Sequence, residues 1–284
     1  MIYSLLIEDV VRRALREDVG TGDVTTLATV PADIRARANI VAKGPGVVAG
    51  LPVLEEVFRQ VSPDIKIKFI REDGAWVRPG DILCEIEGWA RAILTGERVA
   101  LNFIQLLSGV ATRTASFVEL VAGSGARIVD TRKTTPGLRL IEKYAVTVGG
   151  GRNHRMALDD AVMIKDNHIV AAGGIAAAVK RARNAVPHTM TITVECETLE
   201  QVDEALIAGA DVLLLDNMDN ETRAEGVRRA KGKALTEASG SITEETAAEI
   251  AATGVDILSV GALTHSSKAL DISLDIRETY QDLS

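Results

Sequence analysis

The chain has 284 residues, enough for one large domain and a smaller one. Hydrophobic residues make up 46% of it and aromatic residues only 3%, which favours an aliphatic-rich α/β protein over a β-sandwich. The formal net charge of −8 argues against nucleic acid as the main partner.

The chain begins MIYSLLIEDV, which lacks the basic segment of a signal peptide. No apolar run reaches the roughly 18 residues that a membrane span needs, so we expect a cytoplasmic protein without a membrane partner. Hydrophobic spacing over the first part of the chain predicts a mixture of helices and strands. In order, these are a helix at 7–16, a turn-rich loop at 17–26, a strand at 35–43, a helix at 51–61, and short strands at 65–70 and within 73–88.

The segment DGAWVRPGD (73–81) resembles the turn of a biotinyl or lipoyl carrier domain. A carrier also needs a lysine presented on a second hairpin, and the sequence predicts no such hairpin, so this interpretation is set aside. Cys84 and Cys196 lie far apart with no CxxC spacing, which excludes a zinc pattern and predicts two small core residues. From residue 90 to 121 the pattern is helical, with a predicted break near Ser108-Gly109.

After Gly125 the pattern changes to short apolar runs separated by helical segments. Runs at 191–194, 212–215, 234–235 and 257–260 recur every 21 to 23 residues, and those at 128–129 and 161–164 precede them. Two segments, 199–217 and 243–262, share the order helix, glycine, aspartate, strand. This alternation predicts right-handed βαβ units and a parallel sheet, with enough strands to close or nearly close a barrel.

Positive charge is concentrated between Arg127 and His168, where eight Lys/Arg stand against five Asp/Glu, a net charge of +3. The cations fall in tight groups that follow apolar strands, beside the glycines at 149–151. In an acidic protein, such a focus predicts a small polyanionic ligand rather than an extended one. Arginine suits carboxylates and phosphates through its planar fork, and lysine through its point charge.

Other polar residues stand at the predicted carboxyl ends of the strands, where β/α barrels carry their functional groups. Glu195 and Asp216 end successive strands and are suited to Mg²⁺, although each would also stabilise the following helix through its dipole. The small-residue turns at 238–241 and 260–263 fit a barrel phosphate site. Lys165 also ends a strand, which is where a Schiff-base lysine of an aldolase would stand.

These residues belong to long segments that resemble the quinolinate phosphoribosyltransferases, or carboxylating nicotinate-nucleotide pyrophosphorylases. The matching segments run nearly end to end and in a fixed order: EDVGTGDVTT, KGPGVVAGL, GDILCEIEG, GERVALNFIQLLSG, DTRKTTPGLR, EKYAV, GGGRNHR, IKDNH, LLLDN, EASGS and VGALTHS.

The resemblance implies an α/β fold with an N-terminal α/β sandwich domain and an open or incomplete parallel α/β barrel. We place the first domain at 1–108 and the barrel at 109–267, with the tail 268–284 packing back on the first domain. The implied reaction joins quinolinate to phosphoribosyl pyrophosphate, gives nicotinate mononucleotide, pyrophosphate and CO₂, and serves NAD synthesis. Mg²⁺ and a homodimer or higher assembly with shared active sites are implied as well.

The resemblance also implies a role for individual residues. Quinolinate binding falls to Arg132, His154, Arg155 and Lys165, with Arg98 arriving from a neighbouring subunit. Lys133 lies towards the phosphoribosyl substrate. Glu195 and Asp216 match the carboxylates at its ribose and metal, and Lys133, Lys165, Glu195 and Asp216 form the predicted catalytic set. The 5′-phosphate loops correspond to Ser239, Gly240, Gly261 and Ala262.

Three alternatives remain open on the sequence alone. A related transferase would use a different acceptor. A Schiff-base lyase would react through Lys165. A non-catalytic nucleotide-binding module would bind the phosphoribosyl donor without releasing pyrophosphate.

Overall fold

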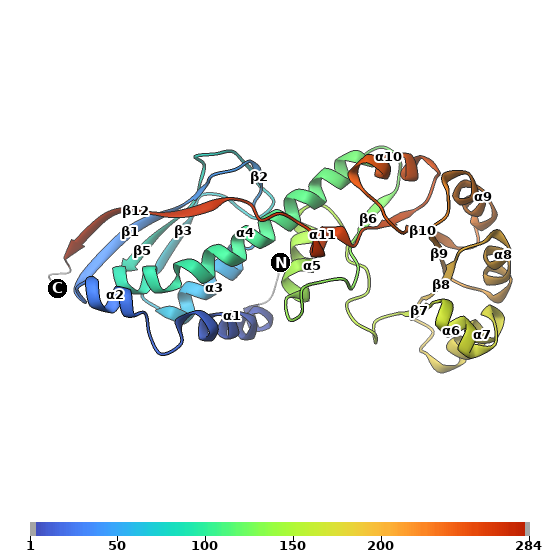
Figure 1. The fold of residues 1–284 in the computed structure, drawn as a ribbon, viewed down its shortest axis with the longest axis horizontal. Helices are drawn as coiled ribbons and strands as arrows, with labels where there is room; N and C mark the ends of the chain where they lie inside the picture. The colour runs from blue at the N-terminus through green and yellow to red at the C-terminus, as the bar shows by residue number, and fades with distance from the viewer. Residues whose placement is uncertain (1–3, 282–284) are drawn as a thin grey trace. The chain divides into compact units, whose positions relative to one another are not determined.

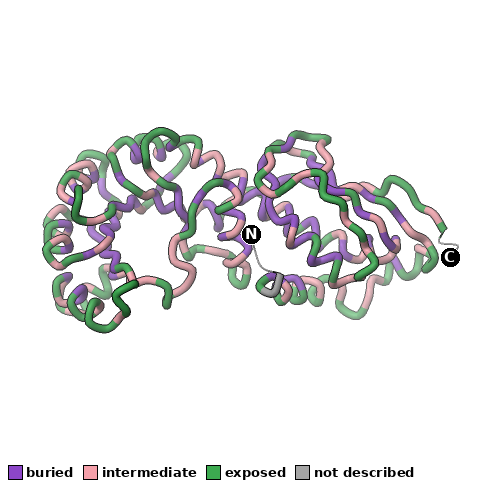
Figure 2. Tube along the Cα trace, turned by 180° about the vertical axis from the view of Figure 1, so that it is seen from behind, coloured by how far each residue is buried: buried purple, intermediate pink, exposed green. Residues whose placement is uncertain are grey.

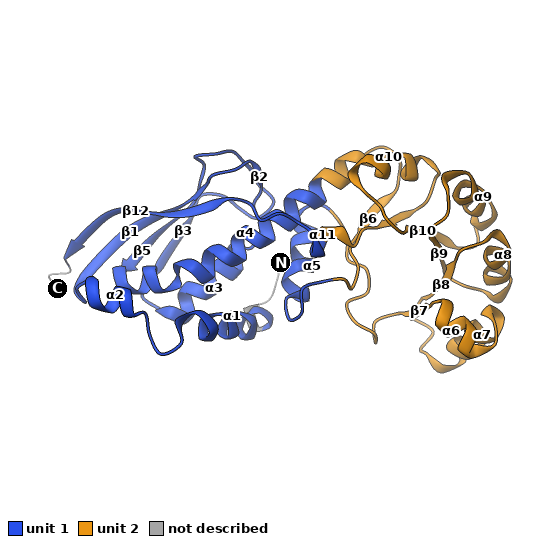
Figure 3. Cartoon of the chain, viewed as in Figure 1, with its two compact units in different colours: residues 1–115, 134–150, 264–284 blue, residues 116–133, 151–263 orange. Residues whose placement is uncertain are grey.

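The computed structural model describes residues 4–281 and contains helices and strands along its whole length (Figure 1). Buried positions follow the strands and one side of the helices, while the outer turns are exposed (Figure 2). The described chain forms two compact units (Figure 3). The first comprises 4–115, 134–150 and 264–281, and the second comprises 116–133 and 151–263. The domain boundaries given above stay predictions.

The first unit is built on a four-stranded antiparallel sheet with the order β12-β1-β5-β3. Its elements are α1 (Ser4–Val19), α2 (Val24–Thr29), β1 (Ile34–Ala42), β2 (Gly46–Val47), α3 (Leu51–Val61), β3 (Lys66–Phe69), β4 (Trp76–Val77), β5 (Ile82–Trp89), most of α4 (Ala90–Leu120), α5 (Arg139–Val148) and β12 (Ile272–Gln281). Along β1, Ala36, Ala38 and Ile40 are buried, whereas Arg37 on the other face is exposed. This alternation is the signature of a sheet with one covered face.

The tail of the chain returns to this sheet as its edge strand. β12 pairs with β1 from Ile34 opposite Gln281 to Ala42 opposite Ile272. On the exposed face, Arg37 donates to Glu278 at 2.6 Å and to Glu87 at 3.1 Å, which links three neighbouring strands. Charged side chains of this kind protect an open sheet face and edge from pairing with another chain.

Two sequence predictions in this unit are wrong. The helix α4 is continuous through Ser108 and Gly109, where a break was predicted. A Cβ on Gly109 would collide with the backbone carbonyl oxygen of Lys268, so this glycine permits a close approach of the C-terminal segment. The predicted loop at 17–26 is mostly helical, because α1 continues to Val19 and Asp23 caps α2 by accepting a hydrogen bond from Thr26 N at 2.9 Å.

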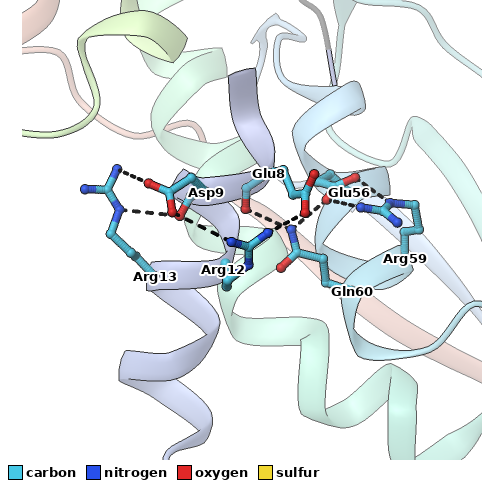
Figure 4. Close-up of polar contacts among 7 residues, drawn as sticks. All are labelled: Glu8, Asp9, Arg12, Arg13, Glu56, Arg59 and Gln60. Atoms are coloured by element: carbon cyan, nitrogen blue, oxygen red, sulfur yellow. Dashed lines mark hydrogen bonds and ion pairs between the residues drawn. The ribbon is translucent and has the colours of Figure 1, made fainter. Parts of the chain in front are cut away.

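A polar cluster joins α1 to α3 (Figure 4). Gln60 donates to the backbone oxygen of Glu8 at 2.9 Å and to the Glu56 carboxylate at 2.6 Å. Arg59 donates two hydrogen bonds of 2.7 Å to the same carboxylate, which is buried. Burial alone would raise the pKa of Glu56, but the hydrogen bonds from Arg59 and Gln60 outweigh it and leave that pKa below its ordinary value.

The second unit contains a six-stranded parallel sheet with the order β6-β11-β10-β9-β8-β7. Its strands are β6 (Arg127–Val129), β7 (Val162–Ile164), β8 (Ile192–Cys196), β9 (Val212–Asp216), β10 (Leu235–Ser239) and β11 (Ile257–Ser259). Its helices are α6 (Asp166–Ala172), α7 (Ile175–Ala185), α8 (Leu199–Ala208), α9 (Asn220–Ala230) and α10 (Glu244–Ala252), with α11 (Ala262–His265) at its border. Among the described strands, β6 and β7 are the two edges, so the barrel is open.

The helices of this unit lie outside the curved sheet (Figure 1). The two similar sequence segments form equivalent structures, and their aspartates make the same contact. Asp211 accepts a hydrogen bond from Ile192 N at 2.7 Å, and Asp256 accepts one from Thr236 N at 2.8 Å. Each aspartate directly precedes one strand and accepts from an amide near the start of the preceding strand, the first residue of β8 in one case and the second of β10 in the other. The repeat thus carries a structural contact, which explains why aspartate recurs at this place.

Both cysteines are free and buried, as predicted for core residues. Burial raises the pKa of Cys84 to about 12, and burial followed by nearby carboxylates raises that of Cys196 to about 12. Within residues 4–281, no helix is both long enough and apolar enough to cross a bilayer.

Candidate active site

The register of the parallel sheet aligns polar residues from several strands on its inner face. Glu195 on β8 and Glu237 on β10 both stand opposite Leu214 on β9. Asp216 and Ser239 are paired two residues further along the same strands. Because side chains alternate between faces, residues two apart share a face. The inner face therefore carries one row of Glu195, Leu214 and Glu237, with Asp216 and Ser239 beyond it at the carboxyl ends.

A pocket of about 170 Å³ opens at these strand ends within the second unit. It is lined by Thr131, Arg132, Lys133, His154, Arg155, Met163, Lys165, Leu214, Glu237, Ser239 and Ser259. Four of these residues are cations, in a protein whose net charge is −8. The sequence separates the cations by up to 33 residues, and the fold brings them to one place.

The cations are held in different ways. Lys165 forms an ion pair with the buried carboxylate of Glu195. Arg155 donates to the backbone oxygen of Ala161 at 3.0 Å, which anchors one side of its guanidinium. Burial, and then the neighbouring Arg132, lower the pKa of Arg155 from its ordinary value. Two guanidinium groups so close together favour a bound anion between or beside them.

His154 is fixed from several sides. Its backbone N–H donates to the buried Asp130 at 2.8 Å. Its ring Nδ1 accepts a hydrogen bond from Arg155 N at 2.7 Å, and its Nε2 lies 3.3 Å from the carboxylate of Glu237. Glu237 is only 2% exposed, and it forms part of the pocket wall.

Both parts of the chain match the domains of one protein family. Residues 23–108 match the N-terminal domain of quinolinate phosphoribosyl transferase, and residues 110–275 match the C-terminal domain of the same family. The chain belongs to the quinolinate phosphoribosyltransferase family.

Individual relatives cover almost the whole chain. A probable carboxylating nicotinate-nucleotide pyrophosphorylase of Bacillus subtilis is 46% identical over 260 residues, which are 92% of this chain and 90% of the relative. A chloroplastic relative of the same name from Arabidopsis thaliana is 45% identical over 95% of this chain and 82% of its own. The solved nicotinate-nucleotide pyrophosphorylase of Francisella tularensis is 40% identical, covers 98% of both chains and superposes with a TM-score of 0.94.

Two predictions are thereby confirmed: membership of the quinolinate phosphoribosyltransferase family, and its α/β fold with a sandwich domain and an open barrel. The assignment of site residues stays a prediction. The structure brings six of them into the pocket lining: Arg132, Lys133, His154, Arg155, Lys165 and Ser239.

The other predicted residues lie outside this lining. Glu195 contacts the pocket through its ion pair with Lys165, and Asp216 stands beside Ser239 at the end of β9. Gly240 directly follows Ser239, and Gly261 and Ala262 follow β11. Arg98 is exposed on α4 in the first unit.

Sequence reasoning assigned no role to several residues that the structure places at the pocket. Glu237 lies on β10 two residues before Ser239, and nothing in its sequence neighbourhood indicates its contact with His154. Asp130 is fully buried and holds the backbone of the same histidine. Thr131, Met163, Leu214 and Ser259 complete the pocket wall. Strand alternation is the signal that finds Leu214 and Glu237, which lie two residues before Asp216 and Ser239 on β9 and β10.

Two carboxylates near the strand ends offer ligands of a type that suits magnesium. Among residues 4–281, no three His, Cys, Asp or Glu side chains gather as a metal site. Glu195 and Asp216 offer oxygen ligands from adjacent strands, which is a donor set of the right chemistry but too small to enclose an ion. Mg²⁺ retains several waters and binds through one or two carboxylates and substrate phosphates, so this set fits it.

Proposed function

We infer that the protein transfers the phosphoribosyl group of phosphoribosyl pyrophosphate to quinolinate. The products are nicotinate mononucleotide, pyrophosphate and CO₂, which makes the protein a pentosyltransferase of de novo NAD synthesis. The relatives carry this activity in their names. The observation that carries the inference is the cationic pocket lined by Arg132, Lys133, Arg155 and Lys165 at the barrel strand ends.

Quinolinate is a dianion, and its two carboxylates need cationic partners. Arg132 and Arg155 provide planar forks, and Lys165 provides a point charge from the end of β7. His154 lines the same pocket, and its ring Nδ1 accepts a hydrogen bond from the backbone N–H of Arg155 at 2.7 Å. An acceptor with one carboxylate makes fewer contacts with this cluster, so we expect the pocket to discriminate against nicotinate.

Glu195 and Asp216 act on the ribosyl group. As pyrophosphate departs, positive charge grows on the ribose, and carboxylates nearby stabilise it. The bond to the pyridine nitrogen of quinolinate then forms, and the ring becomes a pyridinium. When CO₂ leaves, the electron pair of the broken carbon–carbon bond passes to the ring carbon, which takes a proton. The pyridinium stabilises that carbanion, so no organic cofactor is required.

Glu195 and Asp216 would also hold Mg²⁺, whose charge offsets that of the pyrophosphate leaving group. Lys133 lies on the phosphoribosyl side of the pocket. The 5′-phosphate is assigned to the turns after β10 and β11, where Ser239-Gly240 and Gly261-Ala262 offer backbone N–H groups.

The assembly is a homodimer or a higher homo-oligomer in which Arg98 of one subunit completes the site of another. Support for this comes from the exposure of Arg98 on α4. We propose a cytoplasmic location from the sequence alone, and the Arabidopsis relative, which is named chloroplastic, shows that the compartment differs between relatives.

A stoichiometric assay tests this function. Purified protein with quinolinate, phosphoribosyl pyrophosphate and Mg²⁺ should release CO₂ and pyrophosphate in equal amounts. Nicotinate in place of quinolinate should give much slower pyrophosphate release. Comparable turnover of nicotinate would contradict the assignment and favour a transferase with a different acceptor.

The same preparation separates transfer from Schiff-base chemistry. The ammonium of Lys165 is ion-paired with Glu195, whereas a Schiff-base lysine attacks as the neutral amine. Borohydride added during turnover should therefore leave no substrate attached to Lys165. Covalent trapping of substrate there would support the lyase instead.

A further inference from the structure

Asn217, the residue after β9, has an unusual backbone conformation. Its φ is +52°, and among residues 4–281 it is the one non-glycine residue with a positive φ. Asparagine tolerates this left-handed region better than most residues, but the conformation still costs free energy and persists only where the surroundings hold it. Its contacts therefore indicate what the conformation is for.

Three contacts tie Asn217 to its neighbours. Its side-chain Nδ2 donates to the Asp216 carboxylate at 2.7 Å. Its backbone N–H donates to the Ser239 carbonyl oxygen at 3.4 Å. Its Oδ1 lies 2.8 Å from the position that a Cβ on Gly240 would occupy, and Gly240 itself has a φ of +123°.

These contacts interlock the ends of two neighbouring strands. Gly240 is required for two reasons, its backbone conformation and the lack of space beside Asn217. The residue pair on one side is Asp216-Asn217, and the pair on the other is Ser239-Gly240. The first carries the carboxylate assigned to the ribose, and the second carries the turn assigned to the 5′-phosphate.

We propose that Asn217 is a positioning residue for the phosphoribosyl substrate. Its amide orients the Asp216 carboxylate, and its packing against Gly240 holds the phosphate turn beside that carboxylate. The inference rests on the proposed phosphoribosyl transfer. It assigns Asn217 to the donor, because its contacts run to Asp216, Ser239 and Gly240, which are assigned to the ribose and the 5′-phosphate.

The competing explanation is purely structural, since asparagine is simply one of the residues that tolerate a positive φ. Glycine distinguishes the two explanations because it adopts this conformation without strain but has no amide. If only the backbone matters, Asn217→Gly should behave as the wild type or be more stable. If the amide orients Asp216, the same variant should fold normally and handle the donor poorly.

The experiment measures steady-state kinetics, with each substrate varied at saturation of the other, together with thermal unfolding. A hydrogen bond to a charged group predicts a loss of roughly tenfold to a hundredfold in kcat/KM for phosphoribosyl pyrophosphate in Asn217→Gly. The KM for quinolinate and the melting temperature should stay near the wild-type values. Asn217→Asp tolerates the backbone but cannot donate to Asp216, so its loss should be at least as large.

Asp219→Ala is the matched control in the same loop. Asp219 lies two residues beyond Asn217 and caps α9 by accepting a hydrogen bond from Thr222 N at 2.7 Å. Its loss should lower the melting temperature and leave the donor kinetics unchanged. A fall in donor kinetics equal to that of Asn217→Gly would overturn the proposal, because loop stability would then explain both.

Calorimetric titration of the protein with phosphoribosyl pyrophosphate and Mg²⁺ measures donor binding without the reaction. It therefore tests the role of Asn217 separately from the proposed function. A wild type that binds the donor without releasing pyrophosphate refutes the proposed function, and the affinity of Asn217→Gly still tests the positioning role. Wild-type kcat/KM and wild-type donor affinity in Asn217→Gly would overturn the inference while leaving the proposed function intact. A wild type that neither binds nor reacts overturns both.

Discussion

The ring Nε2 of His154 lies 3.3 Å from the carboxylate of Glu237, a buried side chain on β10. The ring Nδ1 already accepts a hydrogen bond from Arg155 N, so it cannot also carry a proton. A neutral ring would then carry its proton on Nε2, the nitrogen that lies beside Glu237. We expect the Glu237 carboxylate to orient the ring, as carboxylate partners of functional histidines do elsewhere.

The contact predicts unequal effects of two substitutions at Glu237. Glu237→Gln retains an oxygen that accepts from Nε2, so the KM for quinolinate should rise by less than about threefold. Glu237→Ala removes the acceptor, and an unsatisfied buried group costs about 1–3 kcal/mol, which corresponds to a rise in KM of roughly one to two decades. Steady-state kinetics with quinolinate varied measures both. Equal KM values in the two variants would show that the carboxylate does not orient His154.

Replacing Arg132 with lysine tests the fork that we assign to a quinolinate carboxylate. Arg132→Lys keeps the charge and loses the bidentate geometry, so quinolinate affinity should fall by about one to two decades. Arg152→Lys, an exposed arginine outside the pocket lining, is the matched control and should change affinity little. Unchanged affinity in Arg132→Lys would place this residue outside the acceptor site.

Glu195→Gln and Asp216→Asn test whether the carboxylates act in the transition state. Both changes keep size and remove charge, so the loss should appear mainly in kcat rather than in KM. Glu195→Gln also removes the ion-pair partner of Lys165, so its melting temperature should fall more than that of Asp216→Asn. Glu197→Gln, which changes an exposed residue between β8 and α8, is the control. Full turnover with only a lower melting temperature would support a helix-capping role.

Local patterns predicted most of the architecture. The helix predicted at 51–61 matches α3. The six predicted apolar runs lie in or beside the six strands of the parallel sheet. Those predictions succeed because hydrophobic period and turn residues are properties of neighbouring positions. The predicted break at Ser108-Gly109 failed because the reason for Gly109 is a segment about 160 residues away in the chain.

The same limit applies to the site. Strand ends indicated Glu195, Asp216 and Lys165, because position along a strand is visible in the sequence. The pairing of Glu237 with His154 depends on strand order and register, which follow from the assembled sheet. The left-handed backbone of Asn217 likewise leaves no local signal beyond the asparagine itself.

The cluster that joins α1 to α3 predicts how stability depends on pH. The pKa of Glu56 is lowered in the folded protein, so its ionised form stabilises the fold above the unfolded-state pKa near 4.5. That contribution is lost as the pH falls through the lower, folded-state pKa. Glu56→Gln should therefore reduce the free energy of unfolding at pH 7 by about 1–3 kcal/mol, and its difference from the wild type should shrink in acid.

Urea denaturation at pH 7 and at pH values below 4 measures this difference. Glu55→Gln changes an exposed neighbour on the same helix and should have little effect at either pH. A Glu56→Gln deficit that stays constant or grows as the pH falls would contradict the assigned direction of the pKa.

The final prediction is that Arg98 acts across a subunit boundary. Arg98→Ala and Arg132→Ala should each be inactive alone, and the two are mixed by co-expression or after reversible dissociation. In a two-fold dimer with shared sites, a mixed dimer has one site with both lesions and one site with neither. Random mixing in equal amounts should then restore roughly a quarter of all sites. If Arg98 serves its own subunit, every site in a mixed dimer keeps one lesion. Two different tags verify that mixed dimers have formed. Verified mixed dimers that recover no activity would exclude the shared site.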